Sequence, residues 1–195
     1  GKKKGSIKVH TNIHANEFVP SDIKFTSAAT NGSFMLKPAN YNDGDIIAMD
    51  RAYIDYARFE ELTNRGVTYV TKMKKNLVYD TLSDTMYMLP CSLMECRVQV
   101  VEFRKHIKGG ENIKHKARIV TYVDPAKKKA KVISLLTNDM TMEVEDIIDI
   151  YRQRWEIELL FKQLKQNFPL KYFYGESANA IKIQIWVTLI ANLLL

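Results

Sequence analysis

The alternation of apolar and polar residues predicts strands over most of the first two thirds of the chain. Two alternating runs joined by a turn lie within residues 5–29, so a β-hairpin is expected there. The apolar run 45–50 predicts a short strand, and the pattern over roughly 53–65 predicts a helix that ends at Gly66. Further alternating runs predict a β-rich middle region, with strands near residues 68–74, 97–107, 113–123 and 129–137.

The last third of the chain is predicted to form two helices. A long helix follows the last strand, and a final helix covers about 177–195. Thr141 is expected to cap the start of the long helix, and Pro169 is expected to end it. Within residues 146–168 one face of this helix is apolar and predicts packing, through Ile157, Leu160, Phe161 and Leu164.

A second face of the long helix is polar and charged. At about 100° per residue, four side chains lie within about 60° of one another, and this polar stripe consists of Tyr151, Arg154, Glu158 and Lys165. An amphipathic helix normally reserves so narrow a stripe for apolar contacts. The polar stripe therefore indicates a ligand such as a phosphate with a metal ion. The alternative is an ordinary surface ion pair between Arg154 and Glu158, worth only a few tenths of a kcal/mol.

The charge of the chain is unevenly distributed. The net charge is +7, from 29 basic and 22 acidic residues. Residues 72–131 contain 14 Lys or Arg against 6 Asp or Glu, a net of +8, so the rest of the chain sums to −1. Such a concentrated basic excess favours a polyanionic partner such as nucleic acid. The alternative is a solubilised surface on which lysines protect the edges of hairpins.

Composition predicts a globular, intracellular protein. The chain has 195 residues, 46% of them hydrophobic, which is enough for a substantial core. The spacing of Cys91 and Cys96 fits neither a zinc site nor a redox motif. His106 and His115 flank a glycine turn and are expected at the surface. The apolar run 185–195 is too short to span a bilayer, so no membrane segment is expected.

The polar stripe belongs to a longer motif. Its residues give the pattern Y-x2-R-x3-E-x6-K within the text DIYRQRWEIELLFKQLKQ. This text resembles the signature of the insertion sequence four family of DDE transposases, which usually reads Y..RW.IE..FK..K. The agreement extends to the neighbouring letters, so the resemblance is specific.

A second match lies upstream in DIIAMDRAYID (45–55). Asp50 follows an apolar strand and precedes R.Y, and it resembles the second catalytic aspartate of the family. Without that comparison, an aspartate after a strand is usually a helix cap or a turn residue.

The resemblance covers nearly the whole chain and implies an α/β fold with a ribonuclease-H-like mixed sheet, helices and a β-rich insertion. It divides the chain into a first part of the core (1–74), a basic β-strand insertion (75–130), and a last core strand with the signature helix and a C-terminal helix (131–195). In this fold the first catalytic aspartate lies on the central strand just before the first hairpin. Only Gly1 and three lysines precede the hairpin in this chain, so that strand and its aspartate are expected to be missing from it.

The family's chemistry implies a site with two divalent metal ions. Asp50 and Glu158 would supply two of its three carboxylates, with Mg²⁺ or Mn²⁺ as the cofactor. Hard cations of this kind prefer oxygen ligands, and two such ions can activate the attacking oxygen and stabilise the leaving oxygen of a phosphodiester.

The partner implied by the resemblance is double-stranded DNA, at both transposon ends and target, with a homodimer in the DNA complex. Tyr151, Arg154 and Lys165 are expected to contact phosphates, with Lys162 beside them. Trp155 either stacks on a base or packs as a buried helix residue. Three further lysines would extend the phosphate contacts towards the insertion, and they are Lys72, Lys74 and Lys75.

Three functions agree with these features. The first is a cut-and-paste DNA transposase core that is truncated before its first aspartate and is inactive as this fragment alone. The second is a non-catalytic, DNA-binding transposase remnant. The third is a ribonuclease-H-like nuclease or resolvase, which shares the metal chemistry but does not explain why tyrosine, arginine and lysine accompany Glu158.

Overall fold

The computed structural model describes the chain as two compact units. The residues that it describes are 7–13, 20–27, 36–89, 94–106, 110–124, 131–167, 174 and 177–194. We call Asn31–Arg152 the sheet unit, and Gly1–Thr30 together with Gln153–Leu195 the hairpin unit.

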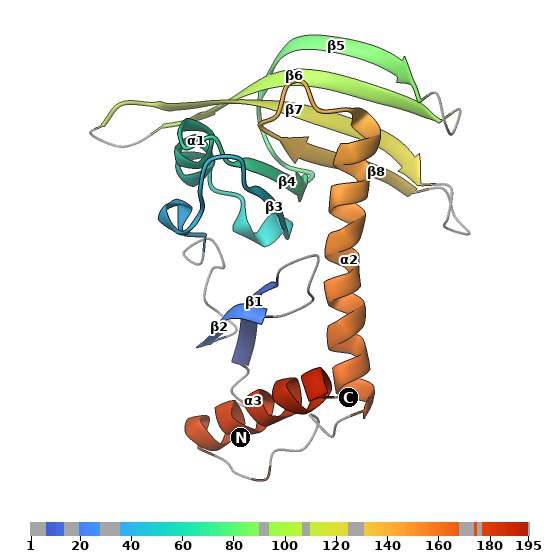
Figure 1. Ribbon diagram of the computed structural model, residues 1–195. Coiled ribbons are helices and arrows are strands. Elements are labelled where there is room, and N and C mark those ends of the chain that lie inside the picture. The colour runs from blue at the N-terminus through green and yellow to red at the C-terminus, as the bar shows by residue number, and fades with distance from the viewer. Residues whose placement is uncertain are drawn as a thin grey trace, which may run out of the picture. The chain divides into compact units, whose positions relative to one another are not determined.

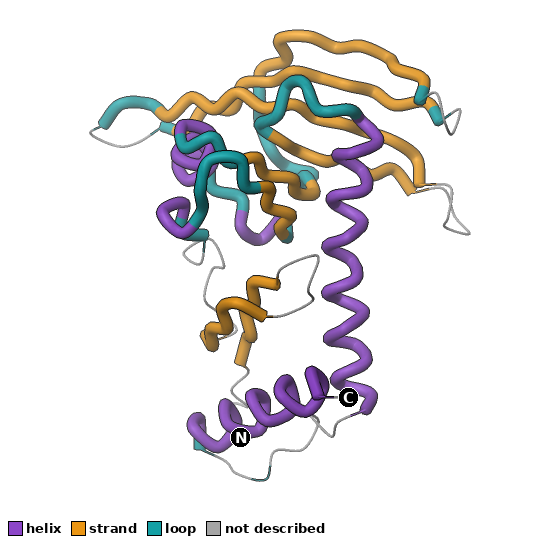
Figure 2. The backbone as a smooth tube through the Cα atoms, viewed as in Figure 1, coloured by secondary structure: helices purple, strands orange, loops and turns teal. Residues whose placement is uncertain are grey.

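The sheet unit is built on a mixed sheet of six strands (Figure 1, Figure 2). Their order across the sheet is β3 (Ile46–Met49), β4 (Thr68–Lys72), β8 (Lys131–Thr137), β7 (Ile113–Asp124), β6 (Glu95–Lys105) and β5 (Asp80–Met88). The pair β3–β4 is parallel and the other pairs are antiparallel. This mixed sheet with its helices confirms the predicted α/β, ribonuclease-H-like fold. The predicted domain boundaries at residues 74 and 130 stay predictions.

The hairpin unit contains the predicted N-terminal hairpin and final helix. Strands β1 (Ile7–Ile13) and β2 (Pro20–Ser27) pair antiparallel, and α3 covers Ala178–Leu194. The signature helix α2 (Val144–Asn167) begins in the sheet unit and continues into the hairpin unit. Among the described helices, none is both long and apolar enough to cross a membrane.

One face of the sheet is covered by α1 (Tyr56–Asn64), and we call it the α1 face (Figure 1). Asp55 caps this helix, because its carboxylate accepts hydrogen bonds from the N–H groups of Ala57 and Arg58. Gly66 ends it at φ 71°, where glycine carries no steric penalty. The buried side chain of Phe59 stacks on Tyr69 of β4, with ring centroids 4.0 Å apart. Other members of this core are Leu62, Val101, Phe103, Ala117, Ile119 and Leu136.

The start of α2 covers the opposite face, which we call the α2 face. Val144, Ile147 and Ile148 are buried there against strands β4, β6, β7 and β8. Their strand partners alternate with those of the α1 face, as the two-residue period of a strand requires. These partners are Val70, Cys96, Val120, Tyr122, Ile133 and Leu135.

Strand β5 lies at one edge of the sheet and was not predicted. Every residue of Asp80–Met88 is exposed, so the sequence shows no alternation between an inner and an outer side. Its Asp84 turns back onto the sheet, where both carboxylate oxygens accept hydrogen bonds from Arg97 of β6. Gln99 of β6 also donates to Asp84, at 3.0 Å. The negative charge of Asp84 on this edge strand is therefore paired with an arginine of the neighbouring strand.

Asn138 joins three elements at the end of β8. Its side-chain oxygen accepts a hydrogen bond from the N–H of Tyr69 at 2.9 Å. Its amide nitrogen donates to the carbonyl of Val67 and to the hydroxyl of Thr63, each at 2.9 Å. The side chain thus satisfies backbone groups of β4 and of the turn before it that strand pairing leaves open.

Asp139 organises the turn that leads into α2. Its Oδ1 accepts hydrogen bonds from the N–H groups of Thr141 and Met142, at 2.8 and 2.7 Å, and from the Thr141 hydroxyl at 3.1 Å. The expectation that Thr141 caps the helix is therefore wrong, because α2 begins at Val144 and Thr141 donates to Asp139 instead. An aspartate at the start of a turn competes well for such backbone donors.

We expect Asn138→Ala to lower the free energy of unfolding by about 2–3 kcal/mol. The truncation leaves a part-buried N–H and carbonyl without their partner, and each unsatisfied group costs about 1–3 kcal/mol. Urea unfolding followed by circular dichroism measures the loss. Asn40→Ala, which truncates an exposed asparagine, is the matched control and should stay within about 0.5 kcal/mol of the unaltered chain. Equal losses in the two variants would contradict this role for Asn138.

Candidate functional site

Asp50 lies immediately after β3, as the motif predicted. It caps the short helix η3 (Arg51–Tyr53), and its Oδ1 accepts a hydrogen bond from the N–H of Ala52 at 2.8 Å. Burial, and then the charge of Asp50, raises the pKa of Tyr53. The cap that is usual for an aspartate after a strand is thus present, and it involves one carboxylate oxygen.

The strand pattern places Asp50 and Lys72 on the same face of the sheet. Ala48 pairs with Val70, which lies in the core under α2. Because side chains alternate along a strand, Asp50 and Lys72 follow on that α2 face. They come directly after Met49 and Thr71, which are paired across β3 and β4. The structure therefore brings these two predicted residues to neighbouring strand ends.

The other two lysines predicted near Lys72 leave the strand. Lys74 is half-buried and Lys75 is exposed in the turn after β4. Both remain in the sheet unit with Asp50. Their predicted contacts with DNA stay predictions.

Tyr151, the first residue of the polar stripe, is a packing residue. Its side chain is 9% exposed and belongs to the core of the α2 face with Ile147 and Ile148. It therefore fixes the rotation of α2 about its own axis, one turn before Arg154.

Arg154 and Glu158 form a close pair on the same helix. Nη2 of Arg154 donates to Oε1 of Glu158 at 2.9 Å. The arginine side chain is 11% exposed and the glutamate side chain 44% exposed. The ion pair considered from spacing alone is present, and it holds the Glu158 carboxylate in one orientation.

The remaining predicted residues of α2 belong to the hairpin unit. Lys162 is exposed, and Trp155 is 50% exposed, so the alternative of a buried, helix-packing tryptophan is wrong. Lys165 lies on α2, and its side chain is outside the described part. Asp50 and Glu158, the two predicted metal ligands, thus belong to different units.

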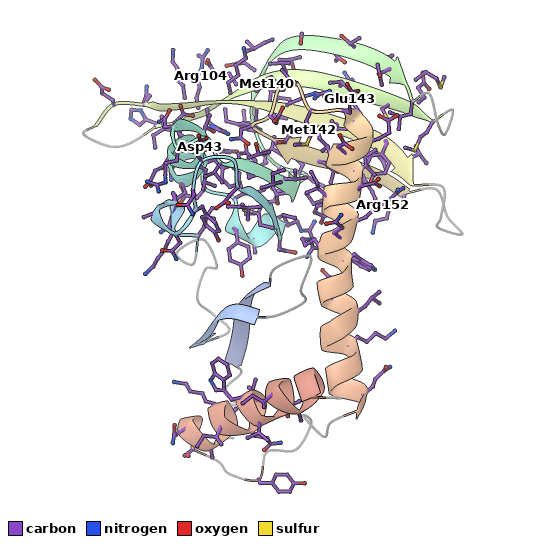
Figure 3. All side chains as sticks on the ribbon, viewed as in Figure 1. Asp43, Arg104, Met140, Met142, Glu143 and Arg152 are labelled. Carbon is purple, nitrogen blue, oxygen red and sulfur yellow. The ribbon has the colours of Figure 1, made fainter. Side chains whose placement is uncertain are left out.

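Arg118 supports the turn before α2 and was not predicted. Its Nη1 donates to the carbonyl of Met142 at 2.6 Å. Burial raises the pKa of Asp139, but the hydrogen bonds from Met142 and Thr141, with the charge of Arg118, outweigh it and lower that pKa. Figure 3 labels Met140 and Met142 on this turn, just before α2. The sequence signal that could have indicated this turn is the pair Asn138 and Asp139 between a strand and a helix.

A cluster of three polar side chains lies between α1 and the sheet. Nε2 of His115 is 2.6 Å from the Tyr69 hydroxyl, and its Nδ1 is 2.8 Å from Oε2 of Glu60. The expectation that His115 lies at the surface is wrong, because strand alternation turns it inward beside Ala117. With Glu60 ionised, the imidazole donates through Nδ1–H and accepts from tyrosine.

This cluster resembles a nucleophile–base–acid relay only in its hydrogen bonds. Tyr69 and His115 are fully buried, so no substrate reaches the tyrosine hydroxyl. Burial raises the pKa of Tyr69 well above its usual value, and the neighbouring Tyr56 and Glu60 act in the same direction. A tyrosine of this kind stays protonated, and the cluster is structural.

The metal chemistry fits the two carboxylates singled out by the motif. Asp50 and Glu158 offer the oxygen donors that hard divalent cations prefer. Within the ranges that the structure describes, no three His, Cys, Asp or Glu side chains gather as a metal site. The two carboxylates thus match the cation in donor chemistry, and their role as its ligands stays a prediction.

Comparison with known proteins agrees with the two motifs. Residues 1–194 match the family model described as "Transposase DDE domain". The match includes both Asp50 and Glu158.

Three curated relatives are named as transposases. A protein of Sinorhizobium fredii is 24% identical over 97% of this chain and 52% of its own length. A protein of Synechocystis, named for an insertion sequence element, is 29% identical over 78% of this chain and 41% of its own length. A protein of Geobacillus stearothermophilus, also named for such an element, is 23% identical over 99% and 49%. The chain spans about half the length of these relatives.

We expect the chain to lose stability as the pH falls below about 6.5. Burial lowers the pKa of His115, although Glu60 opposes the shift. The unfolded state, with its ordinary histidine pKa near 6.5, then binds a proton that the folded state does not. The free energy of unfolding therefore decreases towards acid until the pH reaches the folded pKa, by at most about 1.4 kcal/mol per pH unit.

Urea unfolding at several pH values between about 5 and 8 tests this expectation. His115→Gln should reduce the slope in that window. His106→Gln removes an exposed histidine and should leave the slope unchanged. If His115→Gln retained the slope of the unaltered chain, another group would be responsible.

Proposed function

We infer that this chain, which belongs to the transposase DDE-domain family, forms part of the catalytic core of a metal-dependent DNA transposase. The observation that carries the proposal is the oriented Arg154–Glu158 pair on the helix that begins against the α2 face of the sheet. Asp50 follows a strand on that same face. The reaction would be cleavage of DNA ends followed by strand transfer, of the cut-and-paste type.

The motif favours membership of the insertion sequence four family in particular. All four residues of Y-x2-R-x3-E-x6-K lie on the single helix α2. Tyr151 packs in the core and Arg154 bonds to Glu158, so the first three residues act together to position the carboxylate. This arrangement explains why the first three residues of the motif are three and four positions apart.

Asp50 and Glu158 would hold the divalent cation, Mg²⁺ or Mn²⁺. A bound pair of such ions stabilises the attacking and leaving oxygens of an in-line displacement at phosphorus. A third carboxylate would complete the ligand set, because Asp50 and Glu158 supply only two.

The chain's other residues would bind and orient the DNA. The guanidinium of Arg154 donates to Glu158, and its positive charge would attract a phosphate bound beside that carboxylate. Lys72, beside Asp50, places a positive charge at the strand ends. Lys162, Lys165, Lys74 and Lys75 would add phosphate contacts without reading sequence. Half-exposed Trp155 can stack on an unpaired base.

A non-catalytic remnant that only binds DNA is the second candidate, because the basic residues do not depend on a complete metal site. An in-frame strand ending in aspartate, encoded directly upstream, would favour the transposase over the remnant. A nuclease or resolvase of the same fold would cut DNA without joining its 3′ end to a target. A strand-transfer assay with DNA ends separates these activities, and size-exclusion chromatography with end DNA tests for the proposed homodimer.

We expect Glu158→Gln, in the complete protein that carries this chain, to reduce cleavage of end DNA by at least about 100-fold with Mg²⁺. The amide keeps the size and the hydrogen bond to Arg154 but loses the charge that binds the cation, which is worth several kcal/mol in the transition state. DNA binding should remain within about threefold, because the substituted residue is not a phosphate-binding cation. Gel assays of cleavage and of binding measure both effects.

Asp149→Asn is the matched control on the same helix. Asp149 is exposed and pairs with Arg152, at 3.1 Å, so its substitution should leave cleavage unchanged. Full cleavage by the Glu158→Gln protein would remove Glu158 from the metal site. Equal loss of cleavage in both variants would point to the helix as a whole.

A further inference from the structure

Strand β7 carries a row of basic residues on the α2 face, and we call it the β7 basic row. It consists of Lys114, Lys116 and Arg118. Val120 and Tyr122, the next residues of the same parity, are buried in the core under α2. The alternate residues of β7, such as His115 and Ala117, face α1 instead. The alternation of the strand therefore gathers every second residue into one basic row.

The lysines of this row lie in a region of net positive charge. Lys114 and Lys116 are exposed, and they pair in register with Arg104 and Glu102 of β6. Arg104 binds Glu102 at 2.9 Å and also Asp80 of β5 at 3.2 Å. Figure 3 labels Arg104 on this arm of the sheet. One arginine thus serves both carboxylates, and Lys114, Lys116 and Arg104 together exceed these two acids by one positive charge.

Protection of a sheet edge is the alternative role for these lysines. Charged residues commonly guard edge strands against pairing with other chains. Strand β7 pairs with β8 only from Arg118 onwards, so Lys114 and Lys116 lie on a stretch that pairs with β6 alone among the described strands. A role in edge protection alone would leave the affinity for DNA and its salt dependence unchanged, whereas phosphate contacts would change both.

The row begins beside the helix that carries the proposed catalytic glutamate. Arg118 donates to the carbonyl of Met142, two residues before α2. From there the row runs outwards along β7 for four residues, about 14 Å at 3.4 Å per residue. One strand of B-DNA advances about 3.4 Å per phosphate. Along the helix axis of B-DNA, the length of the row therefore corresponds to about four base-pair steps.

We propose that Lys114 and Lys116 bind backbone phosphates of duplex DNA that lies along the α2 face of the sheet. Arg118, held by Met142, sets the inner end of the row. The inference rests on the proposed function, since it extends the DNA surface from Asp50 and Lys72 onto a strand of the basic β region. These contacts supply affinity and position the duplex without reading its sequence.

The test compares two double variants of the 195-residue chain. Lys114→Gln/Lys116→Gln removes two charges from the β7 basic row. Lys37→Gln/Lys105→Gln removes two exposed charges from the α1 side, where Lys105 lies 3.9 Å from Asp55 and Lys37 precedes the short helix beside α1. Fluorescence anisotropy with a short labelled duplex of arbitrary sequence measures affinity against salt concentration.

We expect the row variant to reduce the slope of log K against log salt by about 2, because each phosphate contact contributes about 0.9. Its affinity near 0.1 M salt should fall roughly 10- to 100-fold, while the control keeps the slope of the unaltered chain. Lys114→Arg/Lys116→Arg should restore binding, since it restores the charge.

Two other results would overturn the proposal. Equal slopes for the row variant and the control would show that the row does not bind phosphates, without contradicting DNA as the partner. No binding of duplex by the unaltered chain would count against both the row and the proposed DNA function. Cleavage by the complete protein, with its Glu158→Gln variant, tests that function separately. Thermal melting by circular dichroism checks that all variants are folded.

Discussion

The hydrogen bonds of Asn138 and Asp139 determine how the signature helix leaves the sheet. Asn138 binds backbone groups of Val67 and Tyr69, and Asp139 binds the N–H groups of the turn that follows. Packing of Ile147 and Ile148 supplies apolar burial but has little directional preference. Hydrogen bonds are directional, so this junction sets the residue at which α2 begins and the direction of its first turn.

The two faces of the sheet serve different purposes. The α1 face is closed by stacked aromatic rings and by the buried Tyr69–His115–Glu60 cluster, whose polar atoms are satisfied inside the protein. The α2 face bears the strand end at Asp50 and the lysines of β7. The α1 face is thus packed and buried, and the α2 face carries the charged groups to which we assign the proposed contacts with DNA.

Patterns of neighbouring residues predicted the features that depend on interactions between residues close in sequence. Periodicity identified the N-terminal hairpin and all three helices, and motif spacing located Asp50 and Glu158. Periodicity did not identify β5, because a fully exposed edge strand has no alternation of buried and exposed residues. It misplaced His115, since the nearby glycine turn outweighed the alternation of Ile113, Ala117 and Ile119 around it. The junction at Asn138 was beyond reach because its partner Tyr69 lies 69 residues away in sequence, and only the fold brings them together.

The pairing of Asp84 with Arg97 has a consequence for how the protein behaves at high concentration. In the described part of the chain β5 pairs only with β6, so its outer backbone groups resemble a template on which another strand could grow. Any strand added there would meet the charged and exposed side chains of this pair, and charge of this kind is one way in which edge strands resist pairing. This edge of the sheet is thus open in geometry but guarded by charge, which disfavours the growth of fibres from it.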